Sequence, residues 1–357
     1  MAKVLMKGNE ALGEAAIKAG ARYYFGYPIT PQNEVTAYMS KRLPEVGGVF
    51  LQAESEVSAI NMVYGAGGAG ARVLITSSSP GISLMQEGIS YIVGAEIPAV
   101  IVNVMRGGPG LGSIQSSQSD YFQATRGGGN GDYNMVVLAP ESIQEMADIM
   151  QDAFDIADQY RNPVMIMADG MLGQMMEPVD LDKPKKEKKD LPPKTWATTG
   201  TAHHKGRNII NSLYLSPDAL EKHNMDLKKK YDDMAKTQVR YEMYNCDDAE
   251  IIAVAYGTTA RIVKNTIAMA AKKGIKMGLI RPISLWPFPQ EPFDLTADKT
   301  LAYLSVEMST GQMVEDVRLA VNGRKPVDFY GRTGGMIPEP KDILAHVENM
   351  MGGVCNA

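Results

Sequence analysis

The sequence predicts an α/β protein with a doubly wound parallel sheet in its first half and a smaller α/β domain after it. Short apolar runs alternate with segments of helical period from residue 10 to residue 170. Such alternation is typical of parallel sheets. It stops in a Pro- and Lys-rich stretch, residues 178–194, and resumes at residue 249. A chain of 357 residues is long enough for two domains.

Each expected strand of the first half is short and apolar, and each expected helix has apolar residues at helical spacing. The clearest helix is 141–160, where Ile143, Met146, Met150 and Phe154 share one stripe. Gly20 is expected just past the end of the first helix, where glycine is favoured. The expected helices are 10–20, 32–43, 57–70, 82–96 and 141–160, and the expected strands lie within 22–28, 48–54, 71–81, 98–110, 135–140 and 163–170.

The expected domains are residues 1–178, a linker and insertion at 179–245, and residues 246–357. The linker is rich in Pro and Lys and has no period, so its lysines are interpreted as a solvated segment and not as a nucleic-acid patch. The insertion is expected to hold one helix, 226–244. The last domain is expected to run strand, helix, strand over 249–289, then strand 300–309, helix 311–323 and strand 327–331.

Composition excludes several classes of protein. A net charge of −5 gives no reason to expect nucleic acid or an anionic membrane as a partner. The N-terminus lacks the apolar core of a signal peptide and no apolar run is long enough to span a membrane, so a cytoplasmic location is expected. Two cysteines, Cys246 and Cys355, cannot form a cluster site, and His203-His204 are interpreted as loop residues. No metal site is expected on this chain.

Four unusual loops each follow an expected strand: "GYPITP" (26–31), "QAESE" (52–56), "SSSPG" (77–81) and "MRGGPGLG" (105–112). Right-handed βα units place such loops on one edge of the sheet, where ligands bind in open α/β folds. We therefore expect a cleft at this edge, although each loop taken alone is explained equally well as a turn.

The polar residues of these loops have structural as well as functional interpretations. Glu54 and Glu56 stand where a strand gives way to a helix of small residues, and acids are favoured in a first helical turn in any case. Arg106 suits a forked grip on a carboxylate, but it could equally be an exposed loop arginine. Thr30 precedes Pro31, a residue favoured at the first helical position, so Thr30 could cap that helix or face a ligand.

With these motifs the sequence resembles the α subunit of the 2-oxoacid:ferredoxin oxidoreductases. The resemblance covers nearly the whole chain and is carried by "GYPITPQNE", "QAESEVSAINMVYGAGGAGAR", "TSSSPGISLMQEGISY", "NVMRGGPGLG", "RPISLWPFP" and "VEMSTGQMVEDV". It implies a thiamine-diphosphate pyrimidine-binding domain, residues 1–178, followed by a domain similar to the transketolase C-terminal domain. The loop "SQSDYFQATRGGGNGDYN" (117–134) looks most like the branched-chain subfamily, which acts on 2-oxoisovalerate (3-methyl-2-oxobutanoate).

The resemblance implies that one glutamate hydrogen-bonds the cofactor's pyrimidine N1′ and favours the tautomer that removes the thiazolium C2 proton. In several thiamine enzymes this glutamate precedes a helix glycine by nine residues, and 65 − 56 = 9 for Glu56 and Gly65. We therefore assign Glu56 to this role, with Glu54 in support.

The resemblance further implies that Thr30 and Arg106 hold the substrate carboxylate. Pro28 and Pro31 restrict the backbone around Thr30, although capping by Thr30 stays open as an alternative. The expected cofactor-binding residues are Tyr27, Pro28, Ile29, Glu54, Ser79 and Pro80.

Two features of the family are missing from this chain. It has no Gly-Asp-Gly followed by Asn, the motif for Mg²⁺ and diphosphate, and no cysteine clusters for iron–sulfur centres. Both are therefore expected on partners: a β subunit that shares the thiamine diphosphate, and iron–sulfur or γ subunits, in a heterotetramer or larger complex. The expected reaction converts a 2-oxoacid, CoA and oxidised ferredoxin into acyl-CoA, CO₂ and reduced ferredoxin. The alternatives are 2-oxoglutarate or pyruvate as substrate, half of a lipoamide-type dehydrogenase, or a scaffold without catalysis.

Overall fold

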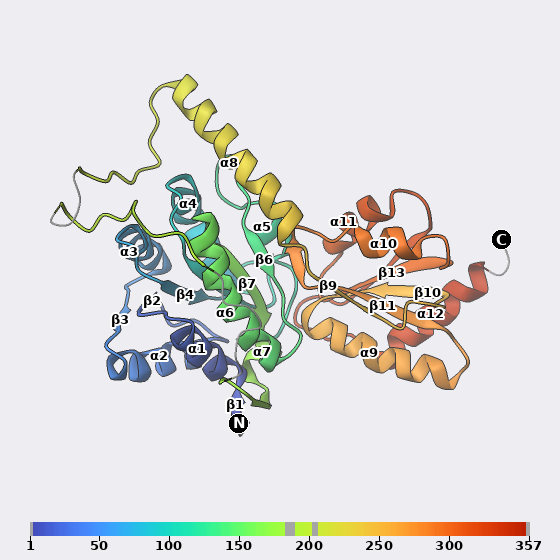
Figure 1. The fold of residues 1–357 in the computed structure, drawn as a ribbon. Coiled ribbons are helices and arrows are strands. Elements are labelled where there is room, and N and C mark those ends of the chain that lie inside the picture. Colours follow the sequence, from blue (N-terminus) through green and yellow to red (C-terminus); the bar gives the residue numbers. More distant parts are fainter. Residues whose placement is uncertain (1–2, 183–189, 202–205, 355–357) are drawn as a thin grey trace.

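The computed structural model describes residues 3–182, 190–201 and 206–354. Two α/β units lie side by side, with the N-terminus in the first and the C-terminus at the far end of the second (Figure 1). Most of the linker lysines, the pair His203-His204 and Cys355 lie outside the described residues. None of the helices in the described parts of the chain combines the length and apolarity that a membrane crossing requires.

The first unit is built on a seven-stranded sheet with the order β12-β6-β7-β5-β4-β2-β3. All its neighbouring strands are parallel except β12 and β6. The strands are β2 (Tyr23–Gly26), β3 (Val49–Gln52), β4 (Val73–Ser77), β5 (Val100–Met105), β6 (Val136–Leu138), β7 (Val164–Asp169) and β12 (Ser284–Trp286). β4, β5 and β7 are buried along their whole length, which explains their continuous apolar sequences.

Helices cover both faces of this sheet, which confirms the doubly wound fold (Figure 1). One group packs together as α1 (Gly8–Lys18), α2 (Asn33–Glu45) and α6 (Ile143–Tyr160), and a second group consists of α3 (Glu56–Gly68) against α4 (Ser79–Gly94). The short helices α5 (Tyr121–Thr125) and α7 (Gly170–Gln174) lie in connections, and β1 (Val4–Lys7) pairs with β8 (Met176–Val179). Gly20, with φ +91°, ends α1 as expected.

The second unit has a five-stranded sheet with the order β14-β13-β10-β11-β9, in which only β9 is antiparallel. Its strands are β9 (Tyr241–Tyr244), β10 (Ile251–Val254), β11 (Met277–Pro282), β13 (Ala302–Glu307) and β14 (Val327–Gly331). Its helices are α9 (Gly257–Lys272), α10 (Glu291–Thr296), α11 (Met313–Val321) and α12 (Pro340–Val354). The smaller α/β domain expected from the sequence is thereby confirmed.

The two units share chain segments as well as surface. β12 comes from "RPISLWPFP", which was expected in the last domain, but it completes the edge of the first sheet beside β6. In chain order α8 (Pro217–Thr237) stands between the two units, and its Leu227, Tyr231 and Met234 are buried in the main hydrophobic core. The predicted helix 226–244 is therefore wrong at both ends, since α8 begins at Pro217 and residues 241–244 form β9.

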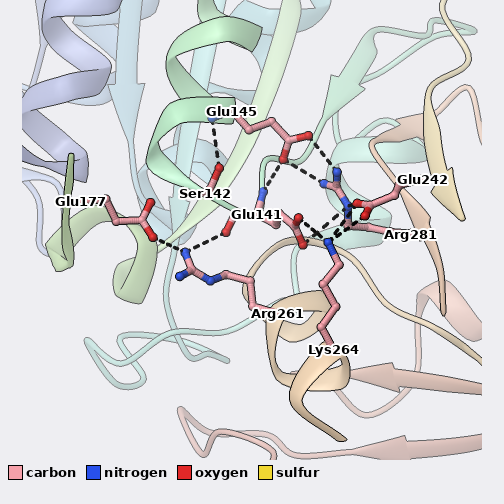
Figure 2. A network of polar contacts seen from close by, with 8 residues as sticks. All are labelled: Glu141, Ser142, Glu145, Glu177, Glu242, Arg261, Lys264 and Arg281. Carbon is pink, nitrogen blue, oxygen red and sulfur yellow. Dashed lines mark hydrogen bonds and ion pairs between the residues drawn. The ribbon is translucent and has the colours of Figure 1, made fainter. Parts of the chain in front are cut away.

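A network of ion pairs joins the units (Figure 2). The nearly buried Arg281 of β11 donates to both carboxylate oxygens of Glu145 on α6 at 2.9 Å, and through Nε to Glu242 on β9 at 2.7 Å. Lys264 of α9 donates to Glu141 at 2.6 Å and to Glu242 at 2.9 Å. Because removing one partner would strand a buried charge, this network holds the two sheets in one relative orientation.

Candidate active site

The turn after β2 bends sharply and delays the start of α2. The peptide bond between Thr30 and Pro31 is cis, and α2 begins at Asn33 with Gln32 as its N-cap residue. The Thr30 hydroxyl accepts a hydrogen bond from the side-chain amide of Asn33 at 3.3 Å, but it caps no backbone N–H of the helix. The alternative left open for Thr30, capping of a helix that starts at Pro31, is therefore not realised, and Thr30 lies partly exposed in the turn itself.

Buried polar side chains form hydrogen bonds to the backbone of this turn and to each other. Gln32 is fully buried, donates to the carbonyl of Tyr27 at 3.3 Å and accepts from the hydroxyl of Thr76 at 2.5 Å. Asn9 donates to the carbonyl of Pro31 at 2.8 Å. Since an unmade bond at a buried polar group is costly, these contacts fix the backbone on both sides of Thr30.

Arg106 points into the first unit and contacts the same turn. The residue is 8% exposed, and its guanidinium donates to the carbonyls of Thr30 at 2.9 Å and Leu111 at 3.2 Å. Its Nε–H is buried without a partner, and no described carboxylate pairs with it. The alternative of an exposed loop arginine is therefore wrong. Of the five N–H donors of a guanidinium, two are used, which leaves a buried positive group able to bind an anion.

The hydroxyl of Ser79 ties the backbone of Arg106 to the start of α4. It accepts from the Arg106 N–H at 3.0 Å and donates to the Arg106 carbonyl at 3.2 Å. Thr30, Ser79 and Arg106 follow three different strands, so the loops do gather at one edge of the sheet as expected.

Glu54 and Glu56 lie in different environments although they are only two residues apart. Ser55 caps α3 by accepting from the Ser58 N–H at 3.2 Å, which makes Glu56 the first residue of the helix. Glu56 is 5% exposed, and none of the described residues donates to its carboxylate. Glu54 is exposed and accepts from the Ser58 hydroxyl. Only Glu56 is therefore placed as a buried, unpaired acid.

The Glu56 carboxylate rests against a glycine of α4. A Cβ at Gly81 would stand 2.5 Å from Glu56 Oε1 and 2.1 Å from Ser77 Oγ, so any larger residue would displace both. The hydroxyls of Ser77 and Ser78 are also buried with no partner in the described parts of the chain. This group of unpaired oxygens is a feature that native proteins rarely leave without a ligand, an ion or water.

The small residues of α3 serve mainly the chain's own packing. A Cβ added at Gly67 would lie 2.5 Å from the side chain of Ile97, and a Cβ added at Gly68 would lie 3.7 Å from the side chain of Ile210. Only Gly65, with open space beyond it, and its neighbours Val57 and Asn61 form an exposed stripe. Any contact with another chain along α3 is limited to this stripe.

The other residues expected to bind a cofactor lie around the same edge. Tyr27 is 39% exposed, Pro28 is exposed and Ile29 is half-buried. Ser79 and Pro80 line a cleft of about 440 Å³ between the glycine loop after β5 and the loops of the second unit.

Asp120 lines this cleft too and was not expected from the sequence. It accepts from Asn103 Nδ2 at 2.8 Å, and burial raises the pKa of its carboxyl, although the nearby Ser79 hydroxyl and the Asn103 amide act to lower it. Asp120 follows no strand but lies before α5 in a long connection, so the strand-end argument could not find it. The one feature of the sequence that could have indicated a functional role for Asp120 is its position in the loop 117–134.

Comparison with known proteins gives consistent matches over the whole chain. Residues 14–244 match the family described as pyruvate flavodoxin/ferredoxin oxidoreductase, thiamine diphosphate-binding, and residues 249–343 match pyruvate:ferredoxin oxidoreductase core domain II. The ketoisovalerate oxidoreductase subunit VorB of Methanothermobacter marburgensis is 49% identical over 99% of both chains. The 2-oxoglutarate synthase subunit KorA of Methanothermobacter thermautotrophicus is 35% identical over 97% of this chain and 98% of that one.

A solved structure shares the fold. The 2-oxoglutarate:ferredoxin oxidoreductase of Magnetococcus marinus, determined with 2-oxoglutarate, coenzyme A and succinyl-CoA, superposes with a TM-score of 0.86 at 26% identity. The match covers 97% of this chain and 65% of that one, so the present chain spans about two thirds of that protein's length.

Proposed function

The chain belongs to the thiamine-diphosphate-dependent 2-oxoacid:ferredoxin oxidoreductases, as a subunit, and from that membership we propose that it binds the cofactor's pyrimidine and the substrate's carboxylate. The proposed reaction is the oxidative decarboxylation of a branched-chain 2-oxoacid with CoA, giving acyl-CoA and CO₂ and passing two electrons to ferredoxin. Identity of 49% to ketoisovalerate oxidoreductase, against 35% to 2-oxoglutarate synthase and 29% to pyruvate synthase subunits, supports a branched-chain substrate.

The observation that supports this site best is the convergence of Glu56, Arg106 and Thr30 at one edge of the first sheet. Glu56 is a buried carboxylate that packs beside Gly81 and receives no hydrogen bond from any described residue, which suits a group that shares a proton with a ring nitrogen. Thiamine diphosphate supplies the electron sink for loss of CO₂. In this proposal Glu56 holds the proton at pyrimidine N1′, while Glu54, exposed beside it, supports the loop.

Arg106 supplies the positive charge for the substrate carboxylate in this proposal. Its unused N–H groups can donate charge-assisted hydrogen bonds to a carboxylate, and two backbone carbonyls accept from the guanidinium and hold it in place. Thr30 lies in the turn after β2, where its carbonyl accepts from Arg106, and offers its hydroxyl as a further donor. Tyr27, Pro28, Ile29, Ser79 and Pro80 are proposed to form the surrounding wall of the cofactor site.

Partner subunits are proposed to complete the active site. Within the described residues no group of three or more His, Cys, Asp or Glu side chains is arranged to hold a metal ion. We assign Mg²⁺ with the cofactor diphosphate to a β subunit, and the iron–sulfur centres to further subunits that pass electrons to ferredoxin. A complex of two α and two β chains, or larger, located in the cytoplasm, is the assembly we propose.

Viologen reduction by the assembled complex tests this function. With CoA and thiamine diphosphate present, 2-oxoisovalerate should give a higher kcat/KM than 2-oxoglutarate or pyruvate. Glu56→Gln should lower turnover by about 10²–10⁴, the usual range for a positioned acid or base, and should slow C2 proton exchange of the bound cofactor measured by NMR. Glu54→Gln is the matched control and should keep most of the activity.

Two results would contradict the proposal. Acyl transfer to lipoamide without viologen reduction would indicate a dehydrogenase half. No binding of thiamine diphosphate by the whole complex would indicate a scaffold.

A further inference from the structure

The second unit has the crevice at which open α/β sheets bind ligands. In its sheet, β10 lies between β11 and β13. After β10 the chain first forms β11 on one side of β10, and later forms β13 on the opposite side of β10. The carboxyl ends of β10 and β13 therefore border a topological switch point, the usual ligand position in this fold. Tyr256 and Gly257 follow β10 there, and Met308 follows β13.

The side chain of Gln118, from the first unit, fills this crevice. Its Nε2 donates to the carbonyl of Tyr256 at 2.9 Å, and its Oε1 accepts from the Thr259 hydroxyl at 2.8 Å and the Met308 N–H at 3.0 Å. The Gln118 N–H donates to the Met308 carbonyl at 2.9 Å, and the residue is fully buried. The second unit thus holds an amide of its own chain in the place of a ligand.

The segment that carries Gln118 leads directly back to Arg106. Arg106 pairs with Ser116 in an antiparallel bridge, and the Gly107 N–H donates to the Gln115 carbonyl at 2.9 Å. On the far side of Gln118, Gln312 of the second unit donates to the Ser119 carbonyl at 2.7 Å. Residues 115–119 are therefore fixed to Arg106 at one end and to the second unit at the other.

We propose that Gln118 is a positioning residue for the 2-oxoacid, because it anchors residues 115–119 in the crevice of the second unit and so holds Arg106 where the substrate carboxylate binds. This role rests on the proposed function of Arg106. It gives the second unit a structural role in the active site, because Gln118 occupies the crevice between β10 and β13. Arg106 would grip the carboxylate in the bound substrate as well as in the transition state, so a loosened Arg106 raises KM more than it lowers kcat.

Three variants in the assembled complex test this role. Gln118→Leu keeps the approximate size and removes all three side-chain bonds, and we expect kcat/KM for 2-oxoisovalerate to fall by about 10–100-fold, chiefly through KM. Thr259→Val removes one bond to Gln118 and should raise KM by about 2–10-fold. Thr266→Val is the control: Thr266 is equally buried on the same helix, but its hydroxyl bonds only the Ile262 carbonyl of that helix, so KM should stay unchanged.

Hydrogen exchange of the amides of residues 107–119 provides a readout that needs no activity. Exchange should speed up in Gln118→Leu and Thr259→Val and stay at the wild-type rate in Thr266→Val. Equal KM values for Thr259→Val and Thr266→Val, or faster unfolding of Gln118→Leu with an unchanged KM, would overturn the positioning role. If the wild-type complex oxidises no 2-oxoacid, the proposed function fails, while the exchange data still report whether Gln118 anchors the loop.

Discussion

Gly81→Ala is the most direct test of whether the position of Glu56 matters. Gly81 lies in the first turn of α4 and is not one of the glycines with positive φ, so its backbone accepts alanine. Helix propensity alone would make the alanine variant more stable by about 1 kcal/mol. The added methyl, however, would lie 2.5 Å from Glu56 Oε1, where ordinary contact begins at 3.4 Å.

The carboxylate oxygen must therefore retreat by 3.4 − 2.5 = 0.9 Å. The oxygen ends a flexible side chain and can move, and the Ser77 hydroxyl, 2.1 Å from the added methyl, must turn to another rotamer as well. In an active site a misplacement of about 1 Å can cost roughly 10²-fold in rate. We expect Gly81→Ala to fold and assemble normally, and to lose about 10²-fold in kcat for 2-oxoacid-dependent viologen reduction.

Gly68→Ala is the matched control. A Cβ at Gly68, the last residue of α3, meets its nearest neighbour at 3.7 Å, an ordinary contact, so activity should be retained. C2 proton exchange of the bound cofactor should slow in Gly81→Ala and not in Gly68→Ala. Wild-type turnover in Gly81→Ala, with the mutation verified and thiamine diphosphate bound, would refute the assignment of Glu56.

Three further predictions follow from the same structure. Arg106→Ala should weaken transition-state binding of the 2-oxoacid by about 2–5 kcal/mol, and Arg106→Lys should lose activity too because the forked geometry is gone; kcat/KM unchanged for every 2-oxoacid would make Arg106 a structural residue only. The purified single chain should not bind thiamine diphosphate tightly in the presence of Mg²⁺, and it should not reduce viologen. Micromolar binding measured by calorimetry would contradict a site shared with a β subunit. Glu242→Gln should lower the free energy of unfolding by about 1–3 kcal/mol at pH 7. Burial acts to raise the pKa of Glu242, but hydrogen bonds from Lys264 and Arg281 hold it below its usual value. The difference in unfolding free energy between wild type and Glu242→Gln should therefore be present above about pH 4.3 and vanish as the pH falls through the pKa of folded Glu242. Urea titrations at several pH values measure this difference, and a difference that does not change with pH would mean that these ion pairs contribute nothing.

The expected helices and strands of the first unit were largely correct because their signals are local. Continuous apolar runs predicted β4, β5 and β7, and the stripe from Ile143 to Phe154 predicted α6. The helix expected at 32–43 matches α2 to within one residue at its start, although Pro31 is not its first residue, since Gln32 is the N-cap residue. The helix expected at 226–244 exists as α8, but its end was placed too late because Tyr241–Tyr244 pairs with β11 and so becomes a strand.

The sequence by itself determined the βα alternation, the glycine and proline turns at the strand ends, and the residue types that could bind a carboxylate. Right-handed crossovers then required these loops to meet at one edge, which brought Arg106 to Thr30. Only the tertiary structure decided which acid is buried. Glu54 and Glu56 have similar local signals, but the side of α3 that packs on Gly81 encloses Glu56 alone. The positions of Gln118 and β12 were likewise decided by contacts between segments more than a hundred residues apart, and that of Asp120 by the cleft that it lines. Neither kind of contact produces a periodic pattern in the sequence.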